Sequence, residues 1–267
     1  MTSRGGRFSG KVVFISGGTS GINLGIAKGF ALAGARVMVF GRSQAKADAA
    51  VREIKSATGC DALGAATDVR DAPAVAVRFA WAVGEIGAPD VVIAGAAGNF
   101  MAPAVNISPN GFGAVVDIDL LGTYHVFRAA FDVVKKPGAS LIAITAPQAV
   151  RPMTEQVHVC AAKAGVNMVV KVLALEWGPV GIRVNALCPG AIAGTEGVER
   201  MAPTEAAKTE WLQRTALRRF GTPADIAQAA LFLSSDEASF VTGTVFDCDG
   251  GMTAGDAGGD HGSRTRS

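Results

Sequence analysis

The segment that decides the fold is Val12-Val13-Phe14-Ile15-Ser16-Gly17-Gly18-Thr19-Ser20-Gly21-Ile22-Asn23-Leu24-Gly25. Its first four residues are apolar and run directly into a glycine-rich turn, a pattern typical of a buried parallel strand. The residues from Ile22 to Leu32 then have helical spacing, and Gly34 ends the predicted helix. The segment therefore predicts a strand, a tight glycine turn and a helix, in that order.

Such a strand–turn–helix unit is suited to binding phosphate. Gly17 allows the tight turn, Gly21 lets the backbone approach a pyrophosphate, and the N–H groups at the helix start face the negative charge. The spacing differs from the common dinucleotide motif, because Asn23 stands where a third glycine is usual. The alternative is a turn that only packs the helix against the strand. The context favours a dinucleotide, with contacts expected from Gly17, Thr19, Ser20, Gly21 and Ile22.

Composition and charge limit the class of protein. The 267 residues include 25 Lys or Arg and 23 Asp or Glu, so the small net charge points to neither nucleic acid nor a membrane as partner. The four cysteines form no Cys-x-x-Cys pair, which is typical of buried thiols in a reducing compartment. We expect no metal site, because no Cys/His/Asp cluster has ligand spacing. We also expect no membrane span and no signal peptide, and hence a cytoplasmic location.

Strands and helices alternate along the rest of the chain. The further predicted strands are 36–40, 61–65, 89–94, 140–145, 182–187 and 244–247. The further predicted helices are 44–58, 73–86, 108–134, 158–177 and 223–233, with 193–219 irregular apart from one short helix. The alternation predicts an α/β protein with a single doubly wound parallel sheet, Rossmann-like, and helices on both faces. We expect one domain over residues 1–253 and a disordered tail over 254–267.

Ligands of such sheets bind at the carboxyl ends of the strands. The turns that follow the predicted strands are therefore expected to line one cleft, and they lie at Gly17, Arg42, Asp68, Gly95 and Pro189.

Several of these motifs together resemble the short-chain dehydrogenase/reductase family over nearly the whole chain. They are Gly17 and Gly21, Asp68-Val69, Ala97-Gly98, Lys163, 182–190, 219–223 and 249–251. Within that family, four segments look like 2,4-dienoyl-CoA reductases, especially the peroxisomal type; they are 96–100, 117–119, 174–179 and 194–197. The resemblance implies NADPH-dependent reduction of a conjugated dienoyl thioester in the degradation of unsaturated fatty acids.

Arg42 favours NADPH over NADH as the cofactor. An acidic residue after the second strand would bind the adenine-ribose 2′-OH, whereas Gly41 leaves room here and Arg42 is a bidentate phosphate donor. A solvated surface arginine is the alternative. The resemblance places Asp68 on the adenine amino group with Val69 beside it, since Asp71 is the better cap for the next helix. It also implies cofactor contacts from Ala96, Gly98, Lys163, Pro189, Gly190, Ile192 and Thr195.

The usual catalytic positions of the family are changed. Val159 and Ala146 stand where most members have a tyrosine and a serine, and Asp119 stands where they have an asparagine. Lys163 lies in an otherwise apolar helical stretch, where a lysine needs a partner or a ligand. Dienoyl-CoA reductases of the peroxisomal type are thought to position a water with an Asp/Lys pair, so the resemblance makes Asp119 and Lys163 the catalytic residues.

The sequence also predicts the positions of a few other residues relative to the site. Tyr124, the one tyrosine, lies five residues after Asp119 on the same predicted helix, so it points away from that residue and is expected to pack in the helix. His158 opens a helix and is expected to be solvated or to cap it. Asn99 and Phe100 are expected to face the thioester.

Two further hypotheses about the activity stay open. One is a carbonyl reductase or alcohol dehydrogenase of the same family with a rearranged proton donor. The other is a catalytically silent NADP(H)-binding protein. Basic residues in or beside the substrate-loop region either meet CoA phosphates or form a solvated face; they are Arg200, Lys208, Arg214, Arg218 and Arg219. The resemblance also implies a homodimer or homotetramer through the helices 108–134 and 158–177.

Overall fold

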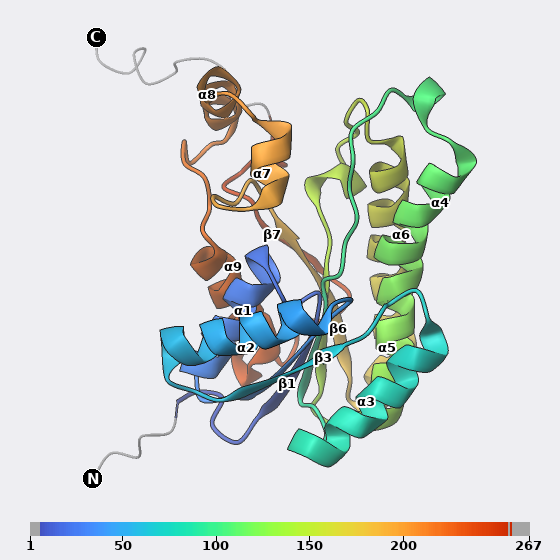
Figure 1. The fold of residues 1–267 in the computed structure, drawn as a ribbon, viewed down its shortest axis with the longest axis vertical. Coiled ribbons are helices and arrows are strands. Elements are labelled where there is room, and N and C mark those ends of the chain that lie inside the picture. The colour runs from blue at the N-terminus through green and yellow to red at the C-terminus, as the bar shows by residue number, and fades with distance from the viewer. Residues whose placement is uncertain (1–5, 256, 258–267) are drawn as a thin grey trace.

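A single parallel sheet forms the centre of the computed structural model, which describes residues 6–255 and 257. Within these residues seven strands are ordered β3-β2-β1-β4-β5-β6-β7 (Figure 1). They are β1 (Val12–Ser16), β2 (Arg36–Gly41), β3 (Ala62–Ala66), β4 (Val91–Ala94), β5 (Ser140–Ile144), β6 (Arg183–Pro189) and β7 (Val245–Cys248). The order reverses between β1 and β4, which opens a crevice at their carboxyl ends. The expected fold class is confirmed.

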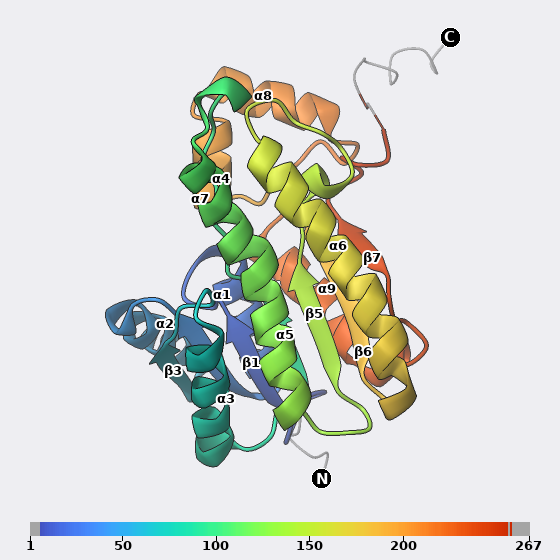
Figure 2. The same cartoon turned by 90° about the vertical axis from the view of Figure 1, so that its right-hand side faces the viewer.

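Helices cover both faces of the sheet. They are α1 (Gly21–Leu32), α2 (Gln44–Thr58), α3 (Ala72–Ile86), α4 (Pro109–Val116), α5 (Gly122–Val133), α6 (Val157–Trp177), α7 (Glu196–Met201), α8 (Glu205–Arg214) and α9 (Pro223–Ser234). Short helical turns are η1 (Ala104–Asn106), η2 (Asp117–Leu121), η3 (Pro147–Ala149), η4 (Gly178–Val180) and η5 (Asp236–Ala238). Helices α1, α2 and α9 pack on one face, and α3, α5 and α6 pack on the other (Figures 1 and 2).

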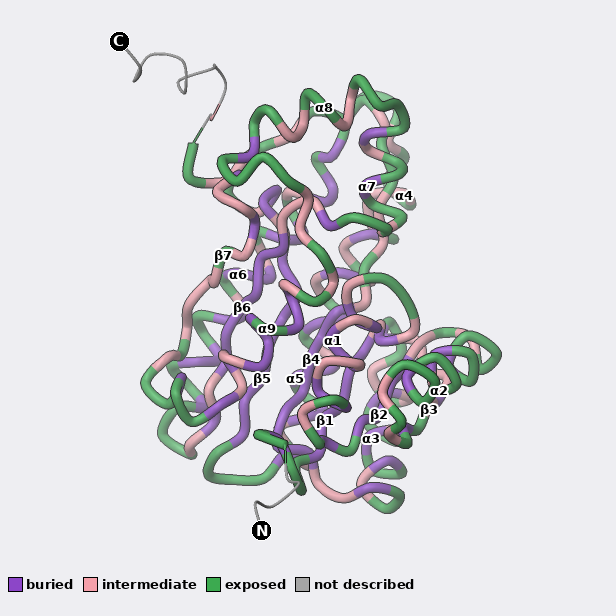
Figure 3. Tube along the Cα trace, turned by 90° about the vertical axis from the view of Figure 1, so that its left-hand side faces the viewer, coloured by how far each residue is buried: buried purple, intermediate pink, exposed green. Residues whose placement is uncertain are grey.

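The strand that precedes the glycine turn shows why its sequence is apolar throughout. Val12 and Phe14 of β1 point into the core under α3, α5 and α6, whereas Val13 and Ile15 point into the core under α1, α2 and α9. Both faces of the strand are therefore covered, and the strands in the middle of the sheet are buried (Figure 3). Alternation of polar and apolar residues is absent because neither face of this strand meets water.

The region between β6 and α9 is more regular than its sequence suggests. It contains both α7 and α8, so the expectation of one short helix was wrong. The side chains of Thr195 and Thr204 cap the two helices by accepting hydrogen bonds from Val198 N (3.4 Å) and Ala207 N (3.2 Å). These helices lie beyond the carboxyl ends of the strands (Figures 1 and 2). Their apolar periodicity is weak because few of their residues are buried: α7 buries Val198 and α8 buries none of its residues.

The long apolar helix also differs from expectation. The 24-residue segment Val157–Val180 is long and apolar enough to cross a membrane, with a mean hydropathy of 1.4 over its most apolar window. The sequence analysis expects no membrane span, yet this segment meets the length and composition of one. Half of that window is buried against the protein, and Lys163 lies inside the segment, which is typical of a core helix. The tail expected to be disordered, 254–267, lies almost entirely outside the described residues.

Candidate active site

A cleft of about 310 Å³ opens at the carboxyl ends of the central strands. Its walls come from the start of α1, the turn after β4, the end of β5, α6, the turn after β6, and α7 and α8. The cleft brings together ten of the predicted site residues, which are Gly21, Ile22, Gly98, Asn99, Asp119, Lys163, Pro189, Gly190, Ile192 and Thr195. Turns from both sides of the switch point thus meet at one site.

The other predicted site residues lie outside the lining of this cleft. They are Gly17, Thr19, Ser20, Arg42, Asp68, Val69, Ala96 and Phe100. Gly17 has a φ of +71°, and a Cβ atom there would lie 2.6 Å from the backbone nitrogen of Ala96. A Cβ atom on Gly41 would lie 2.7 Å from Cγ2 of the Thr19 side chain. The turns after β1 and β4 are therefore in close backbone contact, and the Thr19 side chain packs against the end of β2.

The glycine turn leaves open space where a dinucleotide phosphate would lie. Gly21, at the start of α1, has a φ of +55°, and a Cβ atom there would meet nothing within 4 Å. Among the residues described, α1 has no acidic side chain in its first turn and no side-chain cap from Ser20. Its first N–H groups are therefore available to an anion. These observations fit a dinucleotide bound across the crevice.

Asn23 fastens the glycine turn to the neighbouring strand. Its amide nitrogen donates to Gly95 O (2.7 Å) just past the end of β4. A Cβ atom on Gly95 would lie 2.4 Å from the Asn23 amide oxygen, so the contact requires glycine at this second position. Asn23 stands where the usual motif has a glycine. It joins the turn to the end of β4 by a hydrogen bond instead of by close packing.

A buried ion pair lies in the wall of the cleft. Asp119 is 1% exposed and Lys163 is 5% exposed, and their Oδ2 and Nζ atoms are 3.0 Å apart. The other Asp119 oxygen accepts from Gly98 N (2.7 Å), and Lys163 Nζ also donates to Ile144 O (3.0 Å). An ammonium group has three N–H donors, and within residues 6–255 and 257 only these two acceptors are seen. One donor is therefore available to a ligand in the cleft.

An irregular turn places Asp119 at this position. The predicted helix 108–134 is interrupted by the π-helical turn η2, which contains Asp119. The hydroxyl of Thr123 donates to Asp119 O (2.7 Å), and Gly122 lies so close to Val69 that a Cβ atom would be 2.6 Å from the valine Cγ2. Single π turns often occur at functional sites.

The two positions that usually hold the tyrosine and serine are apolar in the cleft itself. Val159 and Ala146 both line it, so neither can donate a proton. Tyr124 does not take their place: it is 43% exposed and lines a separate groove between α5 and α6. The prediction that Tyr124 points away from Asp119 agrees with this arrangement. The ring of Tyr124 lies beside that of His125 on the same helix, with centroids 6.3 Å apart, and its helix face is exposed in the single chain.

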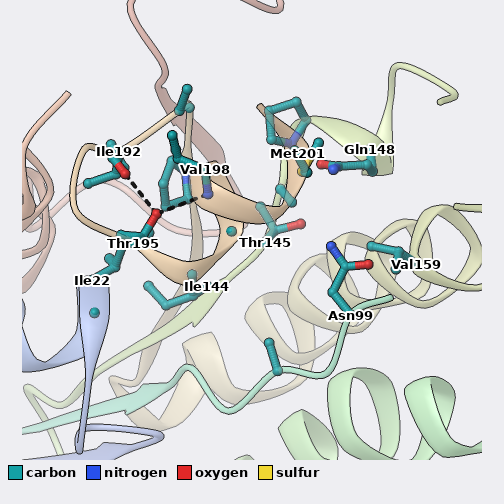
Figure 4. Close-up of a pocket in the computed structure, with 18 of the residues that line it drawn as sticks. Ile22, Asn99, Ile144, Thr145, Gln148, Val159, Ile192, Thr195, Val198 and Met201 are labelled. Carbon is teal, nitrogen blue, oxygen red and sulfur yellow. Dashed lines mark hydrogen bonds between the residues drawn. The ribbon is translucent and has the colours of Figure 1, made fainter. Parts of the chain in front are cut away.

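A chain of amide side chains lies beside the apolar positions. Gln148, on η3, donates to the Gln156 oxygen (2.8 Å), and the nitrogen of Gln156 lies 3.5 Å from the Asn99 oxygen. Gln156 is fully buried. In Figure 4 the nitrogen of Asn99 points toward the middle of the cleft and its oxygen points away. The chain therefore presents Asn99 to a ligand as a hydrogen-bond donor.

Thr145 is a polar residue that the sequence analysis missed. Its hydroxyl is buried at the carboxyl end of β5 and has no partner in the described part of the chain. It points into the same space as Asn99 (Figure 4). A buried hydroxyl without a partner is costly, which indicates a ligand contact. The signal in the sequence was its place at the end of a buried strand.

His158 is in a different environment from the one expected. It is fully buried, and its ring centroid lies 4.2 Å from that of Phe100. Burial lowers the pKa of the imidazole, an effect that the nearby Asp119 carboxylate partly offsets. The solvated or capping role was therefore wrong, because the segment with Asn99 and Phe100 folds over the start of α6. Phe100 itself packs on His158 and stays partly exposed at the rim.

The two charged residues at the adenine end of the predicted cofactor site differ in their partners. Arg42 is exposed and forms no ion pair with the described residues, whereas Asp68 binds Arg70 through both carboxylate oxygens. Those hydrogen bonds lower the pKa of Asp68. Asp71 caps α3 by accepting from Ala74 N (2.9 Å), as the sequence predicts.

Most basic residues near the substrate loop have acidic partners. Arg200 pairs with Glu196, Lys208 with Glu199 and Glu205, Arg214 with Glu210, and Arg219 with Asp225. Exposed pairs of this kind stabilise proteins by only about 0–1 kcal/mol, so an added phosphate can displace them. Arg200 also donates to Asn99 O (2.9 Å), which links α7 to the turn after β4. At the start of α7, the hydroxyl of Thr195 donates to Ile192 O (2.7 Å; Figure 4).

The parallel sheet, the glycine turn and the Asp/Lys cleft together define a dinucleotide-dependent oxidoreductase. Comparison with known proteins agrees. Residues 17–253 match a family model described as enoyl-(acyl carrier protein) reductase. The chain belongs to the short-chain dehydrogenase/reductase family, whose members bind a nicotinamide cofactor.

Several individual relatives are named for a particular reaction. The chain is 42% identical over 243 residues to a peroxisomal 2,4-dienoyl-CoA reductase of Rattus norvegicus, the (3E)-enoyl-CoA-producing type, covering 90% of this chain and 83% of that protein. It is 39% identical over 245 residues to a probable (2E)-enoyl-CoA-producing 2,4-dienoyl-CoA reductase of Bacillus subtilis (strain 168), covering 91% and 96%. A gluconate 5-dehydrogenase from Burkholderia cenocepacia J2315, solved with NADP and tartrate, superposes with a TM-score of 0.85 at 28% identity, covering 93% and 97%.

Proposed function

We propose that this protein reduces 2,4-dienoyl-CoA thioesters with NADPH, in the degradation of unsaturated fatty acids. The observation that carries the proposal is the buried Asp119–Lys163 pair in a cleft where Val159 occupies the place of the usual phenol. The relatives in rat and Bacillus subtilis, which are 42% and 39% identical to this chain, are named as 2,4-dienoyl-CoA reductases.

The chain offers contacts for each part of the cofactor. The glycine turn and the first N–H groups of α1 would hold the pyrophosphate, and Arg42 would hold a 2′-phosphate because it is exposed and forms no direct ion pair with a described carboxylate. Lys163 and the turn from Pro189 to Ile192 would hold the nicotinamide end. When bound, the nicotinamide supplies a hydride to the far end of the diene.

The protein must then stabilise negative charge and deliver a proton. The available N–H of Lys163, the amide nitrogen of Asn99 and the hydroxyl of Thr145 are donors for the thioester oxygen or for a water in the cleft. Asp119 pairs with Lys163 and so keeps its ammonium group in position to bind such a water. The water passes a proton to the dienolate that hydride addition leaves. Protonation at C2 gives the 3-enoyl thioester, protonation at C4 gives the 2-enoyl thioester, and a proton from solvent restores the resulting hydroxide to water. We propose the 3-enoyl product.

A substrate panel tests this proposal. NADPH oxidation is followed with dienoyl-CoA thioesters, with simple ketones and with neither, and the products are identified by mass spectrometry and NMR. Reduction of dienoyl-CoA to the 3-enoyl product is expected. Reduction of ketones alone would favour a carbonyl reductase, and NADPH binding without any turnover would favour a silent binding protein.

Three variants locate the proton source. Asp119→Ala and Lys163→Ala are each expected to lower kcat by about 10²-fold or more, the usual size of a general acid–base contribution. Tyr124→Phe is the matched control, since Tyr124 lies in a separate groove, and it should leave kcat nearly unchanged. Circular dichroism checks folding. Loss of activity in Tyr124→Phe, with Asp119→Ala nearly normal, would place the donor on the phenol instead.

We also propose a homodimer or homotetramer that is cytoplasmic. The exposed faces of α5 and α6 carry apolar side chains around a groove, including Tyr124, Met168 and Val172. An exposed apolar surface of this kind is typical of a subunit contact. Light scattering after gel filtration gives the mass, and Met168→Glu should shift it toward the monomer. Fluorescence microscopy of the tagged protein in its source cells tests the location.

A further inference from the structure

His158 is a buried titratable side chain that the proposed reaction does not use. It lies in the first turn of α6 and is fully buried, and neither ring nitrogen has a hydrogen-bond partner in the described part of the chain. Burying such a polar group costs free energy that a hydrocarbon ring at the same place would not. His158 does not line the cleft, so a ligand there does not contact it. The missing partner is therefore to be sought among the protein groups that face the ring.

Two groups from other elements face the imidazole. They are the backbone of Phe100 and the Asp119 carboxylate on η2, and both partly offset the lowering of the His158 pKa by burial. The carboxylate is already engaged, since its oxygens bind Lys163 and Gly98 N. The Phe100 carbonyl, in contrast, accepts no hydrogen bond of good geometry from residues 6–255 or 257. It is the free acceptor beside the ring.

The segment that carries Phe100 is fastened to the start of α6. The ring centroids of Phe100 and His158 are 4.2 Å apart, with the planes inclined by 46°. Two residues further on, Ala102 N donates to Glu155 O (3.1 Å). Between these attachments and the turn after β4, Asn99 directs its amide nitrogen into the cleft (Figure 4). A hydrogen bond from the imidazole N–H to Phe100 O would hold the backbone one residue from Asn99.

The other attachments of Asn99 are weak. The nitrogen of Gln156 lies 3.5 Å from the Asn99 amide oxygen, at the limit of a hydrogen bond. Arg200 donates to Asn99 O (2.9 Å), but its guanidinium is exposed and is shared with Glu196 on α7. Hydrogen bonds in binding sites are often long or poorly aligned in ligand-free proteins and tighten when the ligand binds. The orientation of Asn99 therefore depends on how its neighbour Phe100 is held.

We propose that His158 is a positioning residue for the thioester: its N–H binds the Phe100 carbonyl when a thioester fills the cleft, and this bond keeps the amide nitrogen of Asn99 directed at the thioester oxygen. The inference rests on the proposed function, because it takes the ligand to be a thioester. It explains why this buried position holds an imidazole, which can donate a hydrogen bond, and not a purely apolar ring.

Substitutions at His158 separate the hydrogen bond from the ring contact. His158→Phe keeps an aromatic ring against Phe100 and removes the N–H. It should lower kcat/KM for hexadienoyl-CoA about five- to tenfold, the effect of one hydrogen bond, and leave the Kd of NADPH within about twofold. His158→Asn and His158→Gln bring an amide N–H near the positions of Nδ1 and Nε2, so one of them should restore part of the activity. Val157→Ala, at an exposed side chain in the same turn, is the matched control and should change neither constant.

A double-variant cycle distinguishes positioning from a general structural role. In an Asn99→Ala background, His158→Phe should cause no further loss of kcat/KM, because the residue that His158 positions is gone. Additive losses would overturn the inference, and so would a His158→Phe enzyme as active as the wild type.

Calorimetric binding of hexadienoyl-CoA to the NADP⁺ complex repeats the cycle without turnover. If the wild type reduces no dienoyl-CoA, the proposed function fails, yet binding that His158→Phe weakens only in the presence of Asn99 would still support the positioning role. If hexadienoyl-CoA is neither reduced nor bound, both proposals are refuted.

Discussion

Replacing Lys163 by methionine should destabilise the protein more than its loss of volume explains. Asp119 would remain as a buried carboxylate that is 1% exposed, with Gly98 N–H as its one remaining hydrogen-bond donor in the described chain. Removing one partner of a buried pair typically costs about 3–5 kcal/mol, because the other charge is left uncompensated. We therefore expect the free energy of unfolding of Lys163→Met to fall by that amount.

The double variant should recover most of this loss. In Lys163→Met with Asp119→Asn, the buried charge is gone and the asparagine oxygen can still accept from Gly98 N. Two defects remain. Ile144 O loses the Lys163 donor, and the buried NH₂ group of the new asparagine has no partner in place of Lys163. The double variant should thus be less stable than the wild type by about 1–2 kcal/mol, although it is inactive.

Urea unfolding followed by fluorescence measures these differences. The matched control is Asp132→Ala, which breaks an exposed i,i+4 pair with Arg128 on α5 and should change stability by less than about 0.5 kcal/mol. If the single and double variants lose the same stability, Asp119 and Lys163 are not energetically coupled. The buried charge argument, and with it the claim that Asp119 holds Lys163, would then be refuted.

Three further predictions concern the cofactor and the fold. Arg42→Ala should weaken NADPH binding at least about tenfold and leave NADH nearly unchanged, because one charge-assisted contact is worth ~1.5–3 kcal/mol; fluorescence titration checks this, and tighter NADH binding by the wild type would contradict it. Gly17→Val should abolish cofactor binding, and Gly17→Ala should cost more stability than Gly59→Ala, since both have a left-handed backbone but only Gly17 meets the Ala96 backbone; equal losses in urea unfolding would contradict the close contact. Because burial lowers the pKa of His158, the unfolded chain binds that proton first as pH falls below about 7, so the free energy of unfolding should fall between about pH 7 and pH 5. His158→Phe should flatten this slope in thermal unfolding measured across that range, and an unchanged slope would count against the buried neutral imidazole.

The main features of the fold follow from local sequence patterns. The continuous apolar strand before Gly17 predicts a parallel strand covered on both faces, and the structure shows its side chains divided between the two cores. The alternation of strands and helices then leaves few topologies for the sheet. Only one of the two helices α7 and α8 was predicted, because both lack a strong apolar stripe and depend on threonine caps.

The candidate site was likewise predictable from the sequence only in part. Residue types at fixed positions, such as Lys163 in an apolar helix and Asp119 before it, are visible in the sequence because a buried charge requires a reason. Their separation of 3.0 Å is not visible, since it depends on the π turn η2 and on the crossing of two helices. The burial of His158 likewise depends on a remote segment folding over it.

The sequence by itself determined the class of fold, the place of the glycine turn and the two charged residues of the site. The first two follow from short-range periodicity. The charged residues stand out because an isolated charge in an apolar segment has a high free-energy cost. Only the tertiary structure decided which polar groups share the cleft, as for Thr145 and the amide chain that ends at Asn99. It alone showed that Met201 and Trp211, from two different helices, line both the cleft and a neighbouring groove. The physical reason is that these contacts join segments far apart in the chain, and their geometry is fixed by how the helices pack on the sheet.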